Sequence, residues 1–449
     1  ATGPLAGEAL GGWQALVRVT VRRPGFTVAL TEHHVSHTHG ARSGLASPGP
    51  DPSAVFDPLQ AIPLDPQAER LTERNDLSLL LRAPLLGAAP LTVEAFWTRQ
   101  HARYTADGLD TLTAKGNRWG GRLAQPLRAG AHALLLRLDG WVDGASWGAG
   151  NPYPDAASRP HLHATLRDSV AVAGWAVEAE AGAHAAGGTV WPAASLRADR
   201  GGLFVAALHA AEAPARVVAT GYADRVAALD GDADALSRTA TAEAGLELSA
   251  GPFAVALRLQ ASQTDSPLVL VETGGAVRFE RAEGPFRRAV GTLSLAWRGD
   301  APRGLYGTAS ASAFRSLNPD DSPLHSRAAD ALPAAWGHGR LGLRALDLFD
   351  GALDLDLAVR GRAWTAFGSR TFVPAPALFA LPDPAASAPV PARGTLDLVA
   401  EAELQERARI FLVYENALAT RLYDGATLVP VYPLPAHRLR FGVFWVLFN

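Results

Sequence analysis

The last stretch of the chain alternates with a period of two. One apolar row runs through every second residue: Leu439, Phe441, Val443, Trp445 and Leu447. Because successive side chains of a β-strand point to opposite faces, this pattern predicts a strand with one entirely apolar face. In a water-soluble protein such a strand would be a sticky, exposed edge. It fits a strand that closes a barrel whose outer face meets lipid.

Alternation of the same kind recurs along the chain. Segments with one aliphatic row and one polar row occur at 134–143, 253–262, 353–362 and 396–405. In the segment 353–362 the two rows are Leu353, Leu355, Leu357 and Val359 against Asp354, Asp356, Arg360 and Arg362. The aliphatic rows suit contact with lipid, and the charged rows suit a wet interior.

The lengths of the segments and of their connections also indicate a membrane barrel. Several segments sustain the alternation for about ten residues, close to the roughly 9–11 that a tilted strand needs to cross a bilayer. Tight links such as 349–351 alternate with long links such as 366–393. Outer-membrane barrels have short periplasmic turns and long extracellular loops. We therefore expect an all-β fold, a closed antiparallel transmembrane β-barrel of about 16–22 strands.

The strand count is ambiguous at one place. A bacterial barrel should have an even number of strands. A strict count gives an odd number, because the tight link Arg23-Pro24-Gly25 falls on the expected long-loop side. Either the first segment lies outside the wall, or one strand near 170–198 has been counted twice. The alanine-rich part of that region, 176–186, favours strand or turn over helix because glycines lie in and around it.

Composition excludes several classes of protein. The chain has 449 residues, no cysteine and a net charge of -3. These values exclude disulfides and thiolate metal sites, and they argue against a nucleic-acid partner. The sequence has no run of eighteen apolar residues, so we expect no transmembrane helix. The chain also lacks methionine and begins with small residues, which is typical of a chain whose signal peptide has been removed. We expect an N-terminal segment over 1–12 and a barrel over 13–449, in the bacterial outer membrane.

The C-terminal part of the chain resembles the end of TonB-dependent receptor barrels. The likeness rests on the segments Tyr414–Tyr423 and Tyr432–Arg438, the second of which begins Tyr-Pro-Leu-Pro, and on the final strand. That strand resembles the assembly signal read by the barrel-insertion machinery, carried here by Arg440, Gly442, Trp445, Leu447 and Phe448. Asn449 departs from the pattern, since the family usually ends on the aromatic residue.

The resemblance implies a barrel that lies in outer-membrane lipid and is related to uptake receptors. The family builds a plugged wall of about 22 strands, and residues 1–12 are too few to form a plug. The resemblance therefore implies a plugless, receptor-derived barrel or a porin-like relative. A separate protein would have to supply any plug.

Histidines gather in the segment 33–39. In a continuous strand, His33, His37 and His39 project to one face and His34 to the other. Imidazoles at this spacing can bind zinc, copper or nickel, so one interpretation is a metal ion held by His33, His37 and His39. The other interpretation is a polar stripe at the mouth of a barrel. We expect no other cofactor.

Charged residues of the last third of the chain suggest the lining of a lumen. The candidates are Arg340, Arg344, Asp354, Asp356, Arg360, Arg362, Glu401 and Glu403. They could form opposed charge ladders that set the ion preference of a pore. Alternatively, neighbouring strands could pair these charges and partly fill the interior.

The sequence contains no His-Glu-x-x-His motif, and its single Gly-x-Ser-x-Gly match, Gly144–Gly148, lies in an alternating segment without the strand-turn-helix context of a nucleophile elbow, so we do not expect an enzyme. The barrel interpretation predicts a channel for small solutes, porin-like or similar to a plugless TonB-dependent receptor. The alternative is a structural or docking barrel with a filled lumen, whose outward loops bind a partner protein or a surface assembly. A soluble all-β protein, such as a propeller, would instead bury its alternating leucines in a dry core.

Overall fold

The computed structural model describes most of the chain. The described residues are 10–40, 44–46, 62–65, 67–85, 89–106, 111–148, 156–212, 226–229, 237–274, 276–297, 303–373, 378–384, 389–405, 407–418, 427–429, 432–433 and 438–445. None of the helices in these ranges has both the length and the apolar character that a membrane-spanning helix requires.

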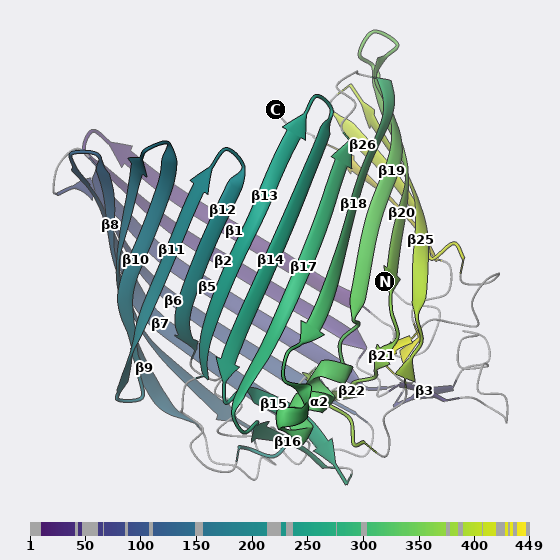
Figure 1. Cartoon of the computed structure of the whole chain (residues 1–449), viewed down its shortest axis with the longest axis horizontal. Coiled ribbons are helices and arrows are strands. Elements are labelled where there is room, and N and C mark those ends of the chain that lie inside the picture. The colour runs from purple at the N-terminus through teal and green to yellow at the C-terminus, as the bar shows by residue number, and fades with distance from the viewer. Residues whose placement is uncertain are drawn as a thin grey trace.

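Nineteen long strands form one antiparallel sheet within the described residues (Figure 1). Each strand pairs with the long strands before and after it, so the sheet is one continuous meander. The strands are β1 (Leu10–Arg23), β2 (Phe26–Gly40), β5 (Glu69–Pro84), β6 (Pro90–Thr105), β7 (Leu112–Ala129), β8 (His132–Trp147), β9 (Ala156–Val172), β10 (Trp175–Ala186), β11 (Thr189–Arg200), β12 (Leu203–Glu212), β13 (Ser237–Ala250), β14 (Phe253–Asp265), β17 (Pro285–Trp297), β18 (Arg303–Ser316), β19 (Ala335–Leu348), β20 (Leu353–Trp364), β25 (Arg393–Leu404), β26 (Ala408–Glu415) and β29 (Arg438–Trp445).

The strand register brings the aliphatic rows of neighbouring strands together on one face. Leu257 lies directly opposite Leu246 on one side and Leu293 on the other. All three side chains are exposed, at 41%, 37% and 43%. Large aliphatic side chains exposed in a continuous band are typical of a surface that meets lipid. This confirms the predicted all-β membrane-barrel fold.

The other face of the sheet is polar and lies on the concave side. Tyr104, on the polar face of β6, packs in the same apolar cluster as Phe279, which lies in the connection between β14 and β17. These strands are far apart in the order of the meander, so the sheet must curl around its polar face to bring them together. Figure 1 shows the front and back walls that result.

The connections differ in length at the two ends of the strands. Short turns join the strands at one end, here called the short-turn end, and most long connections lie at the other, the long-loop end. The placement of Arg23-Pro24-Gly25 on the long-loop side was wrong. This link is a tight turn at the short-turn end, with Gly25 at φ +89°, and β1 belongs to the wall because it pairs with β2 along its whole length.

The region 170–198 does not contain a strand counted twice. The structure forms β9, β10 and β11 there, and the predicted strand character of 176–186 is confirmed. The link between β10 and β11 is the two-residue turn Gly187-Gly188, with φ +57° and +82°. Glycine adopts these angles without strain. A tight turn thus also occurs at the long-loop end, and the number of long strands among the described residues stays odd.

The long connections fold into a structure of their own, which we call the loop cap. Its described parts are 226–229, 266–274, 276–284, 317–334, 365–373 and 378–384. The short elements at this end are β3 (Gly44–Ala46), β4 (Ile62–Leu64), β15 (Leu268–Thr273), β16 (Ala276–Arg281), η2 (Pro319–Asp321), α2 (Pro323–Asp330), β21 (Phe367–Gly368), β22 (Thr371–Val373), β23 (Leu378–Ala380), β24 (Pro389–Val390), β27 (Thr427–Val429) and β28 (Tyr432–Pro433).

Each of the two strands at the edges of the meander has a single partner strand within the described residues. There β1 pairs only with β2, and β29 only with β26. Within the described residues the wall starts with β1 at Leu10, and the expected division of the chain at residue 13 stays a prediction. The final strand has the predicted apolar row as far as Trp445. Leu447 and Phe448 lie outside the described residues.

Candidate functional site

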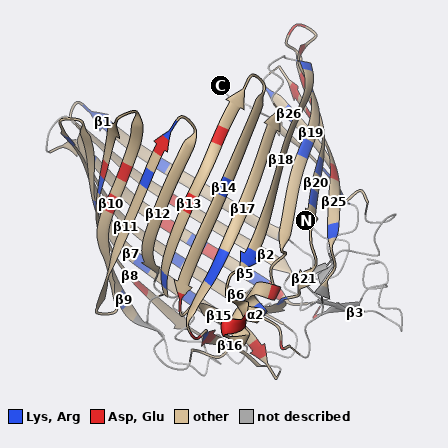
Figure 2. Cartoon of the chain, viewed as in Figure 1, with Lys and Arg blue, Asp and Glu red and all other residues tan. Residues whose placement is uncertain are grey.

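The polar face of the sheet carries charged clusters that link neighbouring strands (Figure 2). In one of them, Asp356 accepts hydrogen bonds from the Tyr306 hydroxyl (2.6 Å to Oδ1) and from Arg340 (3.0 Å). Arg344 lies 3.6 Å from the second carboxylate oxygen. The two guanidinium carbons lie 5.5 and 4.7 Å from the centre of the Tyr306 ring. The cluster places two cations around a single carboxylate.

A second cluster of the same composition lies on β20 and β25. Arg360 and Arg362 share the carboxylate of Asp397, at 3.7 and 3.8 Å. Asp397 is only 7% exposed and also accepts a hydrogen bond from the backbone N–H of Asn416 (3.0 Å). Asp397 was recognised as part of a polar row but not as a lumen candidate, because its two basic partners become visible only when the strands are aligned.

The remaining predicted lumen candidates are also placed on this face. Glu401 pairs with Arg409, and Glu403 lies opposite Arg409 in the register of β25 and β26. Asp354 accepts a hydrogen bond from the backbone N–H of Asp347 (2.8 Å). The interpretation in which neighbouring strands pair their charges therefore describes this wall better than open, unpaired ladders.

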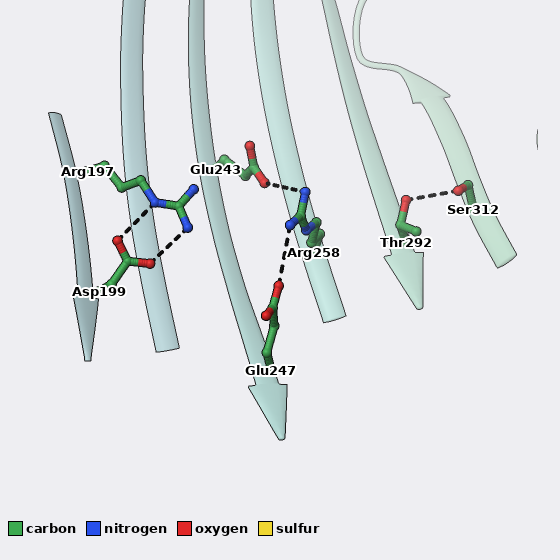
Figure 3. Close-up of polar contacts among 7 residues, drawn as sticks. All are labelled: Arg197, Asp199, Glu243, Glu247, Arg258, Thr292 and Ser312. Atoms are coloured by element: carbon green, nitrogen blue, oxygen red, sulfur yellow. Dashed lines mark hydrogen bonds and ion pairs between the residues drawn. The ribbon is translucent and has the colours of Figure 1, made fainter. Parts of the chain in front are cut away.

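Another part of the wall, on β11 to β14, uses a related arrangement (Figure 3). Arg197 makes two hydrogen bonds of 2.9 Å to Asp199, and Arg258 lies 3.9 Å from Glu243 and 3.4 Å from Glu247. Phe204 lies between the two arginines, with their guanidinium carbons 4.6 and 5.5 Å from its ring centre. Cation–π contacts of this kind stabilise both the ring and the charges.

Beside these clusters, Thr292 and Ser312 bridge β17 and β18 with a hydrogen bond of 2.9 Å between their hydroxyl groups (Figure 3). Ser294 and Ser310 form the next bridge, at 3.1 Å. Cross-strand hydroxyl pairs of this kind stabilise a sheet and keep its surface hydrophilic. This part of the wall is therefore polar without being charged.

A stacked aromatic cluster occupies β8, β9 and β10 toward the long-loop end. The rings of Trp141 and His161 stack at 4.7 Å, and those of His161 and His184 at 5.5 Å. Arg159 Nε donates a hydrogen bond to His161 Nε2 (3.1 Å), and His161 Nδ1 lies 3.3 Å from His184 Nε2. Arg159 and His161 are almost fully buried. His184 joins His161 and His163 only through strand pairing, so sequence reasoning missed this cluster.

The structure confirms the facing of the histidines in 33–39 but does not gather them at one point. His33 lies opposite Asp76, and His37 and His39 follow on the same face, while His34 stacks on Trp13 on the other face. Residues four apart in a strand are separated by roughly 13 Å, too far for His33 and His37 to share one ion. Within the described residues, no group of three His, Cys, Asp or Glu side chains is arranged to hold a metal ion. A metal ion there stays a prediction.

Three residues of the expected assembly signal lie in β29. Arg440 pairs with Glu415 at 2.8 Å, in a cluster that also contains Arg438. Gly442 lies opposite Phe411, whose ring covers it, and Trp445 points to the apolar face. Glu415 is thus a third carboxylate shared by two arginines.

The loop cap joins opposite sides of the mouth through one apolar core. Its buried members come from the long-loop ends of β6 and β7 and from several connections: Ala68, Tyr104, Ala106, Leu112, Val226, Phe279 and Val373. Backbone hydrogen bonds tie the connections together, from Ala227 N–H to Val277 (2.8 Å) and from Leu381 N–H to Leu270 (2.8 Å). The long-loop mouth is therefore spanned by packed polypeptide that extends from the polar face.

This chain is similar to known proteins in its structure. No protein-family model and no curated protein sequence matches the chain. Among solved structures, the chain is similar to the FrpB iron transporter from Neisseria meningitidis, F5-1 variant (TM-score 0.72, 12% identity, 97% of this chain and 72% of that chain). It is also similar to the copper transporter OprC (0.70, 10%, 97% and 71%) and to the siderophore receptor PirA from Acinetobacter baumannii (0.67, 13%, 98% and 71%).

These structures are TonB-dependent receptors of the outer membrane. The fold is that of an outer-membrane β-barrel. At this level of sequence identity the similarity concerns the fold alone, and it agrees with the resemblance found at the C-terminal end of the sequence.

Proposed function

We propose that this protein is a receptor-like outer-membrane channel for small anionic solutes, entered from the long-loop end and gated by the loop cap. The observation that carries the proposal is the apolar core shared by Tyr104 of one wall and Phe279 and Val373 of the cap. A permanently open porin has no need for a packed structure across its mouth. Similar folds named as iron and copper transporters and as a siderophore receptor support uptake over catalysis.

The charge of the polar face supports an anionic solute. Asp356, Asp397 and Glu415 are each shared by two arginines. Each of these three clusters therefore has one more positive than negative charge, whereas the cluster of Arg258 with Glu243 and Glu247 has one more negative charge. Histidines add further donors on the half of this face nearer the long-loop end: His33, His37, His39, His161, His163, His184 and His338. Fields of excess positive charge in a narrow aqueous bore favour anions.

Single-channel recording in planar bilayers tests this proposal. The wild-type barrel should show small or rare openings. Replacing 319–331 by Gly-Ser-Gly removes α2 from the cap and should raise conductance several-fold, with a reversal potential that indicates anion preference. Exchange of the short turn Gly251-Pro252 for Asn-Gly is the matched control and should leave conductance unchanged.

The structural or docking alternative makes the opposite prediction. If both the wild-type and the cap-shortened barrel are folded but electrically silent, the interior is filled and the transport proposal fails. The pairing of charges within the wall is the observation that favours this second function. If the cap-shortened barrel conducts without preferring anions, only the solute class is wrong.

A further inference from the structure

Three arginines lie on the apolar face, at the long-loop ends of neighbouring strands. They are Arg238 of β13, Arg287 of β17 and Arg315 of β18, and all three are exposed. Their facing follows from the register: Arg287 lies opposite Gln263 and Arg315 opposite Ala289. Gln263 in turn lies opposite Ala240, in line with the outward row of β13 that contains Leu246. These arginines therefore continue the lipid-facing rows and do not line the interior.

This arginine rim has a net positive charge. The carboxylate that faces it is Asp265, opposite Arg238 in the register of β13 and β14. Gln263 connects the two sides: its Nε2 donates to Asp265 Oδ1 (3.0 Å), and its Oε1 accepts from Arg287 Nε (2.9 Å). Arg287 is thereby held in place through its Nε, and its side chain is exposed.

The position of the rim matches the level of lipid headgroups. An arginine on the lipid face costs roughly 2–4 kcal/mol at the middle of a bilayer, and about 0–1 kcal/mol near its surface. The band of exposed leucines lies nearer the short-turn end of the same strands: Leu246, Leu248, Leu257, Leu259, Leu293 and Leu295. The three arginines lie beyond this band, where anionic headgroups of the long-loop leaflet would meet them.

Between the leucine band and the arginine rim, the apolar face dips into a shallow groove. Its volume is about 550 Å³, and its lining includes Ala207, Ala240, Ala242, Ala261, Gln263 and Arg287. The groove thus runs from an apolar floor to a cationic end. A ligand that fits has a hydrocarbon chain joined to an anionic group.

We propose that this surface binds an anionic membrane lipid of the long-loop leaflet. The lipid's phosphate groups would lie along the row formed by Arg238, Arg287 and Arg315, and one acyl chain would fill the alanine-lined groove. Charge-assisted hydrogen bonds between guanidinium and phosphate are strong and directional. The proposal depends on the membrane placement of the barrel and is independent of what passes through its interior.

Native mass spectrometry of the full chain in an uncharged detergent tests the proposal. The probe is diphosphorylated lipid A, compared with its dephosphorylated form and with inorganic phosphate at equal concentration. We expect retention of diphosphorylated lipid A, at least tenfold weaker retention of the dephosphorylated form, and no displacement by inorganic phosphate. Equal retention of the two lipids would overturn the role of charge, and displacement by inorganic phosphate would mean that the rim binds free anions.

Variants locate the site on the surface. R238Q/R287Q/R315Q should lower lipid retention at least tenfold. A242L/A261L keeps every charge but fills the groove, and it should also lower retention. R99Q/R103Q alters exposed arginines on the apolar face of β6 and should stay within twofold of wild type. Unchanged retention in both site variants would refute the proposal, and the groove variant keeps the test valid if the triple variant does not fold.

Discussion

At the scale of single residues, aromatic rings lying on cross-strand glycines organise the polar face. Phe204 is directly opposite Gly245, and Tyr306 is opposite Gly342. A Cβ atom on Gly245 would come within 2.2 Å of the Phe204 ring, so the ring occupies the space that glycine leaves open. Glycine normally weakens a strand, and a covering aromatic compensates for this weakness.

Phe204 provides a test of this arrangement. The ring is only 2% exposed, so Phe204→Ala should lower the free energy of unfolding by about 3 kcal/mol. Gly245→Ala should cost about 1–3 kcal/mol, because the new methyl group displaces the ring. The double variant should cost clearly less than the sum of the two. Equilibrium unfolding of the barrel in lipid vesicles measures these values, and strict additivity would contradict direct coupling between the two residues.

The sequence predicted the polar rows of several strands but not which residues of neighbouring strands lie opposite each other. Alternation places the polar rows correctly, as in 353–362, because the period of two follows from strand geometry alone. Register brings the arginine pair to Asp397 and the Phe204 ring to Gly245. A single sequence determines register only weakly when the rows of neighbouring strands have similar composition. The cluster of His161 and His184 was missed for the same reason.

At the scale of elements, α2 holds the loop cap together through one side chain. Arg327 donates to three carbonyl oxygens: Glu272 (3.1 Å), Leu381 (3.2 Å) and Pro382 (2.6 Å). The first acceptor belongs to β15, and the other two follow β23. One guanidinium thus joins three connections that lie far apart in the sequence.

Arg327→Gln should therefore loosen the cap without unfolding the wall. Hydrogen bonds from a charged donor contribute about 1.5–3 kcal/mol each, so losing part of this set should speed amide exchange in 268–281 by at least tenfold. Exchange in 122–138, the short-turn parts of β7 and β8, should stay unchanged, because none of these residues belongs to the apolar core of the cap. Hydrogen-exchange mass spectrometry measures both segments. Protection of 268–281 equal to wild type would show that the apolar core alone holds the cap.

The sequence distinguished short turns from long connections but did not predict a cap. The segment 366–393 was recognised as long because it interrupts the alternation with proline and polar residues. The packing of the cap depends on single apolar residues such as Val373 and Phe279, each in a different connection. No local pattern brings such residues together, because the contact exists only after the sheet has curled.

At the scale of the whole molecule, the direction of the two edge strands determines how the wall can close. With an odd number of antiparallel strands among the described residues, β1 and β29 run the same way, from the long-loop end to the short-turn end. If these edges pair with each other, the pairing is therefore parallel, with evenly spaced and slanted hydrogen bonds. The strict count of alternating segments in the sequence was already odd, and only the general rule for bacterial barrels favoured an even number.

We predict that β1 and β29 pair directly in a membrane, because every unpaired backbone N–H or C=O group in hydrocarbon costs several kcal/mol. The chain has no cysteine, so engineered cysteine pairs can form disulfides only with each other. Val443→Cys, combined in turn with Val17→Cys, Val19→Cys or Val21→Cys, should give a disulfide in at least one combination, since paired strands are about 4.8 Å apart.

Leu257→Cys with Leu293→Cys is the positive control for the seam, because these residues lie directly opposite each other on β14 and β17. Val443→Cys with Leu257→Cys joins distant strands and should remain reduced. Non-reducing electrophoresis after oxidation in lipid vesicles distinguishes the products. If the control pair forms and none of the three seam pairs does, other strands must lie between β1 and β29. Because β1 and β29 run in the same direction, an odd number of additional antiparallel strands would fit between them.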